Sequence, residues 1–127
     1  MVGAWKGLSM SEHDLQKQII AYLRLKKFLC FETDVMDGLK FFSPKDSRRF
    51  AFIKHHNDMG YIKGQPDLII LLPIGNALFV EVKTAKGRQS DEQKEFQRRV
   101  ESLGFNYLIW RSVDDAVKWC ESPLSLP

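Results

Sequence analysis

Apolar residues recur at helical spacing in two long segments and one short one. The first begins after Ser11, an N-cap residue type, and places apolar side chains at positions 15, 19, 22 and 23. The second follows the capping-box pattern of residues 90–93 and runs to Leu103, with positions 96, 100 and 103 on one face. A short last helix is predicted to follow Ser112 and to end near Cys120.

Runs of β-branched and aromatic residues predict five strands. They are FLCFETDV, LKFF, LIILLPI, ALFVEVKT and FNYLIWR. The Gly75-Asn76 turn joins the third and fourth runs into a central hairpin, and Asp37-Gly38 separates the first two. Between the second and third runs, a helix is predicted from Pro44 to about Asp58, closed by Gly60.

These elements predict one α/β domain in which helices flank a mixed central sheet, in the order α-β-β-(α)-β-β-α-β-α. The chain has 127 residues, enough to bury roughly two-thirds of its unfolded surface. We expect the domain over residues 11–120, a flexible tail at 1–10 and a frayed tail at 121–127. Cys30 and Cys120 are too few for a disulfide framework or a zinc site and suit a reducing interior. The sequence holds no apolar run long enough for a membrane span and no signal peptide, so we expect a cytoplasmic protein without a membrane partner.

Positive charge is concentrated in one segment of the chain. Residues 40–63 hold six Lys and Arg against two Asp, a net charge of +4, whereas the remainder carries −1. A local basic surface on a near-neutral protein favours a polyanion partner, although an ordinary solvated helix face fits the charge equally well. The candidate nucleic-acid-binding residues are Lys45, Arg48, Arg49, Lys54, His55, His56 and Lys63.

Charged residues also interrupt the apolar hairpin, where they are unexpected. Asp67 precedes LIILL, and Glu81 and Lys83 lie within FVEVKT. Because side chains alternate along a strand, Glu81 and Lys83 share one side, and the hairpin brings Asp67 toward the same end of the sheet. Two neighbouring carboxylates repel unless a cation or a shared proton lies between them. Lys83 can neutralise only one of them, which leaves a site suited to Mg²⁺ or Mn²⁺.

Such a site can hydrolyse a phosphodiester bond. A divalent ion between two carboxylates lowers the pKa of a bound water and screens the charge that develops at phosphorus. Lys83 can orient that water, act as a base or stabilise the developing charge, and the sequence does not separate these roles. The spacing therefore predicts a metal-dependent hydrolase with Asp67 and Glu81 at its centre.

The arrangement G-x-P-D, thirteen residues, then E-x-K resembles the PD-(D/E)xK nuclease superfamily, and more closely its VRR-NUC family. It reads here as GQPDLIILLPIGNALFVEVKT, preceded by SEHDLQKQIIAYL and followed by SDEQKEFQRRVESLG and FNYLIWRSVDDAV. The resemblance covers roughly residues 11–118. It departs from the family pattern at SPKDSRRFAFIKHHND, a basic insertion that leaves the substrate open.

The resemblance implies a restriction-endonuclease-like core and a role for each matching residue. Asp67, Glu81 and the Val82 carbonyl would bind metal, and Glu12 would bind it directly or through water. Lys83 would be catalytic, and Gln93 would orient Lys83 or the attacking water. Two ordinary alternatives remain: Glu12 as a carboxylate favoured at a helix start, and Gln93 as the reciprocal partner of the Ser90 cap.

The resemblance also implies an activity. Stand-alone relatives of this kind are Mg²⁺- or Mn²⁺-dependent endonucleases, and some act in DNA repair as homodimers that cut branched DNA such as four-way (Holliday) junctions. We therefore expect a DNA endonuclease in the cytoplasm of a bacterial or phage-infected cell, or associated with the nucleoid. The alternatives are an inactive nucleic-acid-binding module of the same fold, and a nuclease acting on linear DNA or RNA.

Overall fold

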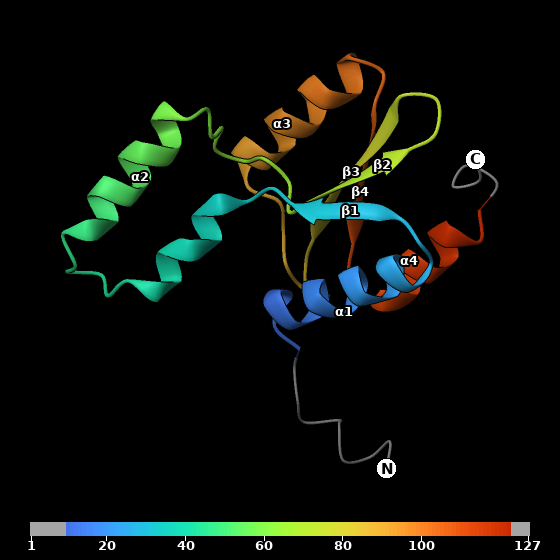
Figure 1. Cartoon of the computed structure of the whole chain (residues 1–127), viewed down its shortest axis with the longest axis horizontal. Helices are drawn as coiled ribbons and strands as arrows, with labels where there is room; N and C mark the ends of the chain where they lie inside the picture. Colours follow the sequence, from blue (N-terminus) through green and yellow to red (C-terminus); the bar gives the residue numbers. More distant parts are fainter. Residues whose placement is uncertain (1–9, 123–127) are drawn as a thin grey trace, which may run out of the picture.

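A computed structural model describes residues 10–122 and shows a four-stranded sheet at the centre of the protein (Figure 1). The strands are β1 (Leu29–Glu32), β2 (Leu68–Leu72), β3 (Asn76–Val82) and β4 (Asn106–Trp110), and they lie side by side in that order. β1 and β3 each pair with β2 in the antiparallel sense, whereas β4 runs parallel to β3. The mixed sheet and the central hairpin predicted from the sequence are confirmed.

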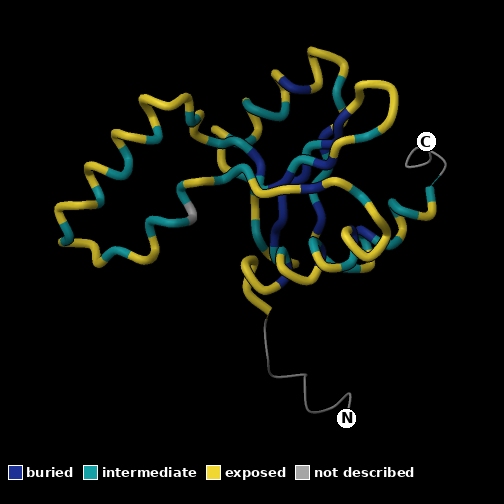
Figure 2. Tube along the Cα trace, viewed as in Figure 1, coloured by how far each residue is buried: buried dark blue, intermediate teal, exposed yellow. Residues whose placement is uncertain are grey.

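Helices cover both faces of this sheet. α1 (Glu12–Leu25) and α4 (Val113–Cys120) pack below it in Figure 1, and α3 (Asp91–Ser102) lies above. The apolar core lies between the sheet and the α1–α4 pair (Figure 2). The core side chains come from alternate strand residues, one stripe of α1 and one residue of α4: Leu15, Ile19, Leu23, Cys30, Leu68, Ile70, Leu78, Val80, Val82, Trp110 and Ala116.

The predicted helix starts are confirmed by their caps. The Ser11, Ser90 and Ser112 side chains each accept a hydrogen bond from the backbone N–H three residues later. One detail of the α3 prediction is wrong, because Leu103 does not share the buried face. It lies past the last helical residue, at the C-cap, and is 76% exposed.

Residues 34–63 form a projection that we call the arm. It contains the 3₁₀ helix η2 (Val35–Phe41) and the helix α2 (Arg48–Asp58), which lie beside each other and extend away from the sheet in Figure 1. No residue of α2 is buried, and Figure 2 shows the arm as a mixture of exposed and intermediate positions. The inner side of α2 rests on η2 through Phe52, which stacks near Phe42 and approaches Gly38.

Two predictions within the arm are wrong. LKFF is not a strand but part of η2, because the Asp34 carboxylate accepts the N–H of Met36 and begins a tight helix that leads the chain away from the sheet. The next helix begins at Arg48 rather than Pro44. The N-cap residue, Ser47, makes no side-chain cap hydrogen bond, and the Asp46 carboxylate instead accepts the N–H of Arg48, the first helical residue.

The remaining predictions concern the ends of the chain and the membrane. The proposed tails at 1–10 and 121–127 lie almost wholly outside the described residues. Within residues 10–122, no helix is long and apolar enough to cross a membrane.

Candidate active site

The predicted carboxylate pair meets where β2 begins and β3 ends. Asp67 directly precedes β2, and its backbone N–H donates to Val80 O at 3.1 Å. Its carboxylate accepts the N–H of Val82 at 2.7 Å, so the end of β3 holds the Asp67 side chain in place. The hairpin register therefore brings Asp67 and Glu81 together as the sequence predicted.

Glu81 is buried on the face of the sheet that α3 covers. Its neighbours Val80 and Val82 point into the opposite, apolar core, whereas the Glu81 side chain is 2% exposed. Oε1 of Glu81 accepts a hydrogen bond from Gln93 Nε2 at 3.0 Å, and Oε2 accepts one from the Tyr107 hydroxyl at 3.3 Å. Both oxygens of this carboxylate are thus oriented by side chains from other elements.

Burial and a neighbouring charge change the acidity of this carboxylate. Desolvation raises the pKa of Glu81 to about 9, and the charge of Asp67 and a hydrogen bond with it act in the same direction. Lys83 partly opposes these effects. At neutral pH the pair therefore holds a proton unless a cation takes its place, which is the behaviour expected of a metal site.

Lys83 lies one residue beyond β3, beside Glu81. Its backbone N–H donates to Trp110 O at 3.0 Å, and its side chain is 9% exposed. Its positive charge acts on the Glu81 carboxyl group, where it partly offsets the effect of the Asp67 charge. The structure thus brings Asp67, Glu81 and Lys83 into one site.

Glu12 lies farther out, at the start of α1. It is exposed, but its carboxylate approaches Gly87 in the loop after β3: a Cβ on Gly87 would lie 3.4 Å from Glu12 Oε1 and 3.4 Å from Lys83 Cδ. Glu12 therefore lies on the Lys83 side of the site. It does not join the carboxylate pair, because residues 10–122 hold no group of three His, Cys, Asp or Glu side chains close enough to bind one metal ion.

Gln93 fills the cap role considered in the sequence analysis, and its side chain also reaches into the site, where it contacts Glu81. Its Oε1 accepts the N–H of Ser90 at 2.8 Å, and Ser90 Oγ accepts the N–H of Gln93, which completes the capping box. Its Nε2 donates to Glu81 at the same time. A glutamine suits this position because its amide carries an acceptor for the helix end and a donor for the buried acid.

Three residues that the sequence analysis did not single out support the site. Tyr107 donates to Glu81 from β4, and burial and that carboxylate raise the pKa of its phenol. Gln65 donates to Thr33 O at 2.5 Å and accepts the N–H of Ile62 at 3.1 Å. Arg111 donates to Thr84 O at 2.8 Å and Gly87 O at 2.6 Å. Little in the sequence marked these residues: Gln65 occupies the variable position of the G-x-P-D motif, Tyr107 lies within a predicted strand, and Arg111 lies at its end.

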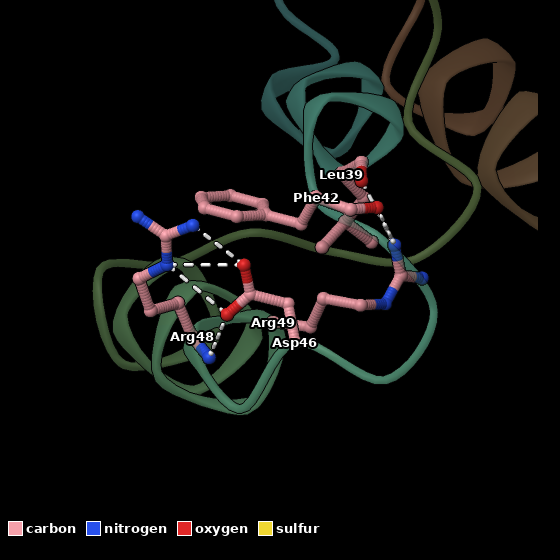
Figure 3. A network of polar contacts seen from close by, with 5 residues as sticks. All are labelled: Leu39, Phe42, Asp46, Arg48 and Arg49. Carbon is pink, nitrogen blue, oxygen red and sulfur yellow. Dashed lines mark hydrogen bonds and ion pairs between the residues drawn. The ribbon is translucent and has the colours of Figure 1, made fainter.

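The predicted nucleic-acid-binding residues lie on the arm or where it ends, away from the carboxylate pair. Arg48 is bound to Asp46, and this pairing lowers the pKa of Asp46 to about 2 (Figure 3). Arg49 donates to Leu39 O and Phe42 O and so holds the end of η2 (Figure 3). Lys54 pairs with Asp58 and Lys63 with Glu92, whereas Lys45 is exposed. The His56 ring contacts the Phe52 ring at a tilt and the His55 ring edge-on.

The donor set of the site fits a hard divalent cation. Carboxylate oxygens are the ligands that Mg²⁺ and Mn²⁺ prefer, and the raised pKa of Glu81 beside Asp67 marks where positive charge would be favourable. Asp67 and Glu81 would hold such an ion. Water completes the coordination of Mg²⁺ in most proteins, so two carboxylates suffice.

The sequence matches the VRR-NUC domain over residues 10–114, which is most of the chain. This protein belongs to the VRR-NUC family. A solved VRR_NUC domain is 21% identical, with a TM-score of 0.61, over 88% of this chain and 96% of the other. A VRR_NUC domain protein is 16% identical, with a TM-score of 0.65, over 90% of this chain and 88% of the other. No curated protein matches the sequence. The VRR-NUC assignment establishes a nuclease-type α/β fold and nucleic acid as the substrate class.

Proposed function

We propose that this VRR-NUC chain is a Mg²⁺- or Mn²⁺-dependent endonuclease that hydrolyses DNA phosphodiester bonds. The observation that carries the proposal is the pairing of half-buried Asp67 with buried Glu81, beside Lys83. A cation held by this pair would supply Lewis-acid charge and a more acidic water. We assign Asp67, Glu81 and the Val82 carbonyl to the cation, and Glu12 to a water-mediated contact from the Lys83 side.

The protein's own groups then orient the reaction. The Gln93 amide and the Tyr107 hydroxyl fix the Glu81 carboxylate, so its position does not depend on solvent. The Val82 N–H fixes Asp67. Lys83 brings a positive charge to the side on which a phosphate would develop negative charge, and there it stabilises that charge or orients the attacking water.

The main test of this proposal compares Asp67→Asn with Asp58→Asn, a matched change on the exposed arm. Plasmid and oligonucleotide cleavage would be measured with Mg²⁺, with Mn²⁺ and with EDTA. We expect wild type and Asp58→Asn to cleave only with metal, and Asp67→Asn to lose roughly 10²-fold or more in rate. Equal rates for all three would disprove the proposal. Binding of DNA without any cleavage by wild type would identify an inactive binding module.

The basic residues of the arm are proposed to contact DNA phosphates. Several of their pairs are exposed: Arg48, Lys54 and Lys63 have side-chain exposures of 74%, 78% and 79%. Exposed ion pairs are weak, so a phosphate can replace a carboxylate partner at small cost. Lys45, His55 and His56 extend this surface, and Arg49 holds it in shape. We propose the cytoplasm or the nucleoid as the place of action, because a DNA substrate is accessible there.

We further propose a homodimer that cuts branched DNA such as a four-way junction. One chain carries one site and makes one cut, so symmetric cutting requires a two-fold pair. The arm supplies the apolar contact surface: Phe41 and Phe50 are each 80% exposed and Met59 is 72% exposed.

Phe50→Glu tests this assembly against Leu103→Glu, a change at an equally exposed residue outside the arm. Light scattering should show a dimer for wild type and Leu103→Glu and a monomer for Phe50→Glu. The monomer should nick a four-way junction but lose paired cuts. Linear duplex, single strands and RNA, assayed in parallel, would show whether the wild type prefers the junction. A monomeric wild type with junction DNA bound would rule the dimer out.

A further inference from the structure

The segment between the arm and β2, residues 64–67, is called the linker here, and it contacts the first turn of α3. Gly64 has φ of +94°, and a Cβ there would overlap the Glu92 carbonyl and lie 2.9 Å from Gln93 N. The adjacent Lys63 Nζ pairs with Glu92 Oε1 at 3.3 Å. Gly64 therefore contacts the peptide bond that carries Gln93 on its C-terminal side.

The same turn of α3 holds the Gln93 amide against the buried acid. Gln93 reaches Glu81 at 3.0 Å while it accepts from Ser90 at 2.8 Å, so its side chain is stretched between two fixed points. A shift of the Glu92–Gln93 peptide changes both distances together. The distance between the Gly64 backbone and the first turn of α3 thus sets whether the Gln93 amide can bond to Ser90 and Glu81 at the same time.

We propose that Gly64 is a positioning residue for the active site: by its lack of a side chain it lets the linker brace α3 where Gln93 reaches Glu81. The expected effect on catalysis rests on the proposed function, but the contact between Gly64 and α3 can be tested without any nuclease activity.

A second glycine provides a matched control. Gly60 has φ of +103°, the same left-handed backbone region as Gly64, but a Cβ there meets nothing within 4 Å. Alanine at either position strains the backbone in the same sense. Only Gly64→Ala adds an overlap with α3, so the difference between the two variants isolates the brace.

The first measurement needs no nucleic acid. The side-chain amide resonances of Gln93, followed by ¹⁵N NMR, should shift in Gly64→Ala and keep their wild-type positions in Gly60→Ala. Unchanged Gln93 resonances in Gly64→Ala would overturn the proposal. Because this readout is independent of cleavage, it decides the matter even if the chain proves not to be a nuclease.

The second measurement is a double-mutant cycle on cleavage rate. Gly64→Ala should lower kcat by about 10- to 100-fold with KM for DNA little changed, since small misplacements in active sites have effects of this size. In a Gln93→Ala background the same change should add less than about 2-fold, as expected when two residues act as a unit. Additive effects would show that Gly64 does not act through Gln93. Equal cleavage rates for Gly64→Ala and Gly60→Ala would also overturn the proposal.

Should Gly64→Ala fail to fold, Lys63→Glu replaces it. This variant sets two carboxylates against each other at the same turn and should shift the Gln93 resonances, and Glu92→Lys in the same chain should restore them. Wild-type resonances in Lys63→Glu, or no restoration in the double variant, would overturn the proposal.

Discussion

The core and the arm of this protein are held together by contacts of different kinds. In the core, polar contacts join residues far apart in the chain: Val82 to Asp67, Gln93 to Glu81, and Tyr107 to Glu81. In the arm, they join near neighbours, such as Arg48 to Asp46 and Lys54 to Asp58. The buried apolar residues of the described chain all lie outside the arm, and α2 buries none.

This difference separates two requirements of a nuclease. Chemistry needs groups that hold their geometry without water, and contacts across a packed sheet provide this. Recognition of a large, charged substrate needs accessible groups that can exchange partners, and exposed local ion pairs allow it. The following predictions test whether catalysis and binding divide between the two regions in this way.

The largest effect is expected from Lys83→Met, which removes the buried charge of the core and keeps an unbranched side chain of similar length. We expect kcat to fall by about 10³-fold while DNA affinity stays within about 2-fold, because the ammonium acts on developing charge. Steady-state cleavage and fluorescence anisotropy would measure the two. Lys86→Met, in the exposed loop that follows, is the control, and equal losses in both variants would contradict the assignment.

The next largest effect is expected from Gln93→Glu, which should lower kcat by about 10²-fold. A glutamate keeps the acceptor for the Ser90 N–H, so the capping box survives, but it loses the donor to Glu81 and adds a third negative charge. Helix content by circular dichroism should not change. Gln18→Glu on the exposed side of α1 controls for added charge, and unchanged cleavage in Gln93→Glu would remove Gln93 from the site.

The stability of the metal-free protein should fall as pH rises. The pKa of Glu81 is near 9 in the folded protein and near 4.5 when unfolded, so the folded state binds the extra proton between these values. Its contribution is complete below pH 4.5 and is lost as pH rises through 9. Thermal unfolding in EDTA should show a Tm that drops by several degrees from pH 6 to pH 9. Glu81→Gln should flatten this profile, and Mg²⁺ should raise Tm most at high pH.

The smallest effect is expected from the arm. Lys45→Ala combined with Lys54→Ala should raise KM for DNA by about 5- to 10-fold and leave kcat nearly unchanged, because exposed phosphate contacts act on binding. The dependence of affinity on salt should weaken in the same variant. Lys17→Ala with Lys118→Ala, on helices α1 and α4, is the control. A fall in kcat for the arm variant with unchanged KM would reverse the division between the regions.

The same division explains how far the sequence could predict the structure. Helix caps, the hairpin and the Asp67–Glu81–Lys83 cluster follow from local patterns, and the structure contains them. The arm does not follow, because LKFF has the composition of a strand but no neighbour to pair with. Tyr107 and Arg111 could not be singled out, since their partners lie 26 and 24 or more residues away.

Gln65 binds both sides of the arm at its base, with Thr33 before it and Ile62 near its end. The two chain ends of the arm therefore meet at one side chain in the segment that leads into Asp67 and β2. Such a closed base makes the arm a replaceable unit: a longer, shorter or differently charged segment can be inserted between the same two points while the carboxylate pair beneath keeps its register. New substrate preferences can then be engineered, or can arise, by exchanging one surface segment while the sheet and its flanking helices stay the same.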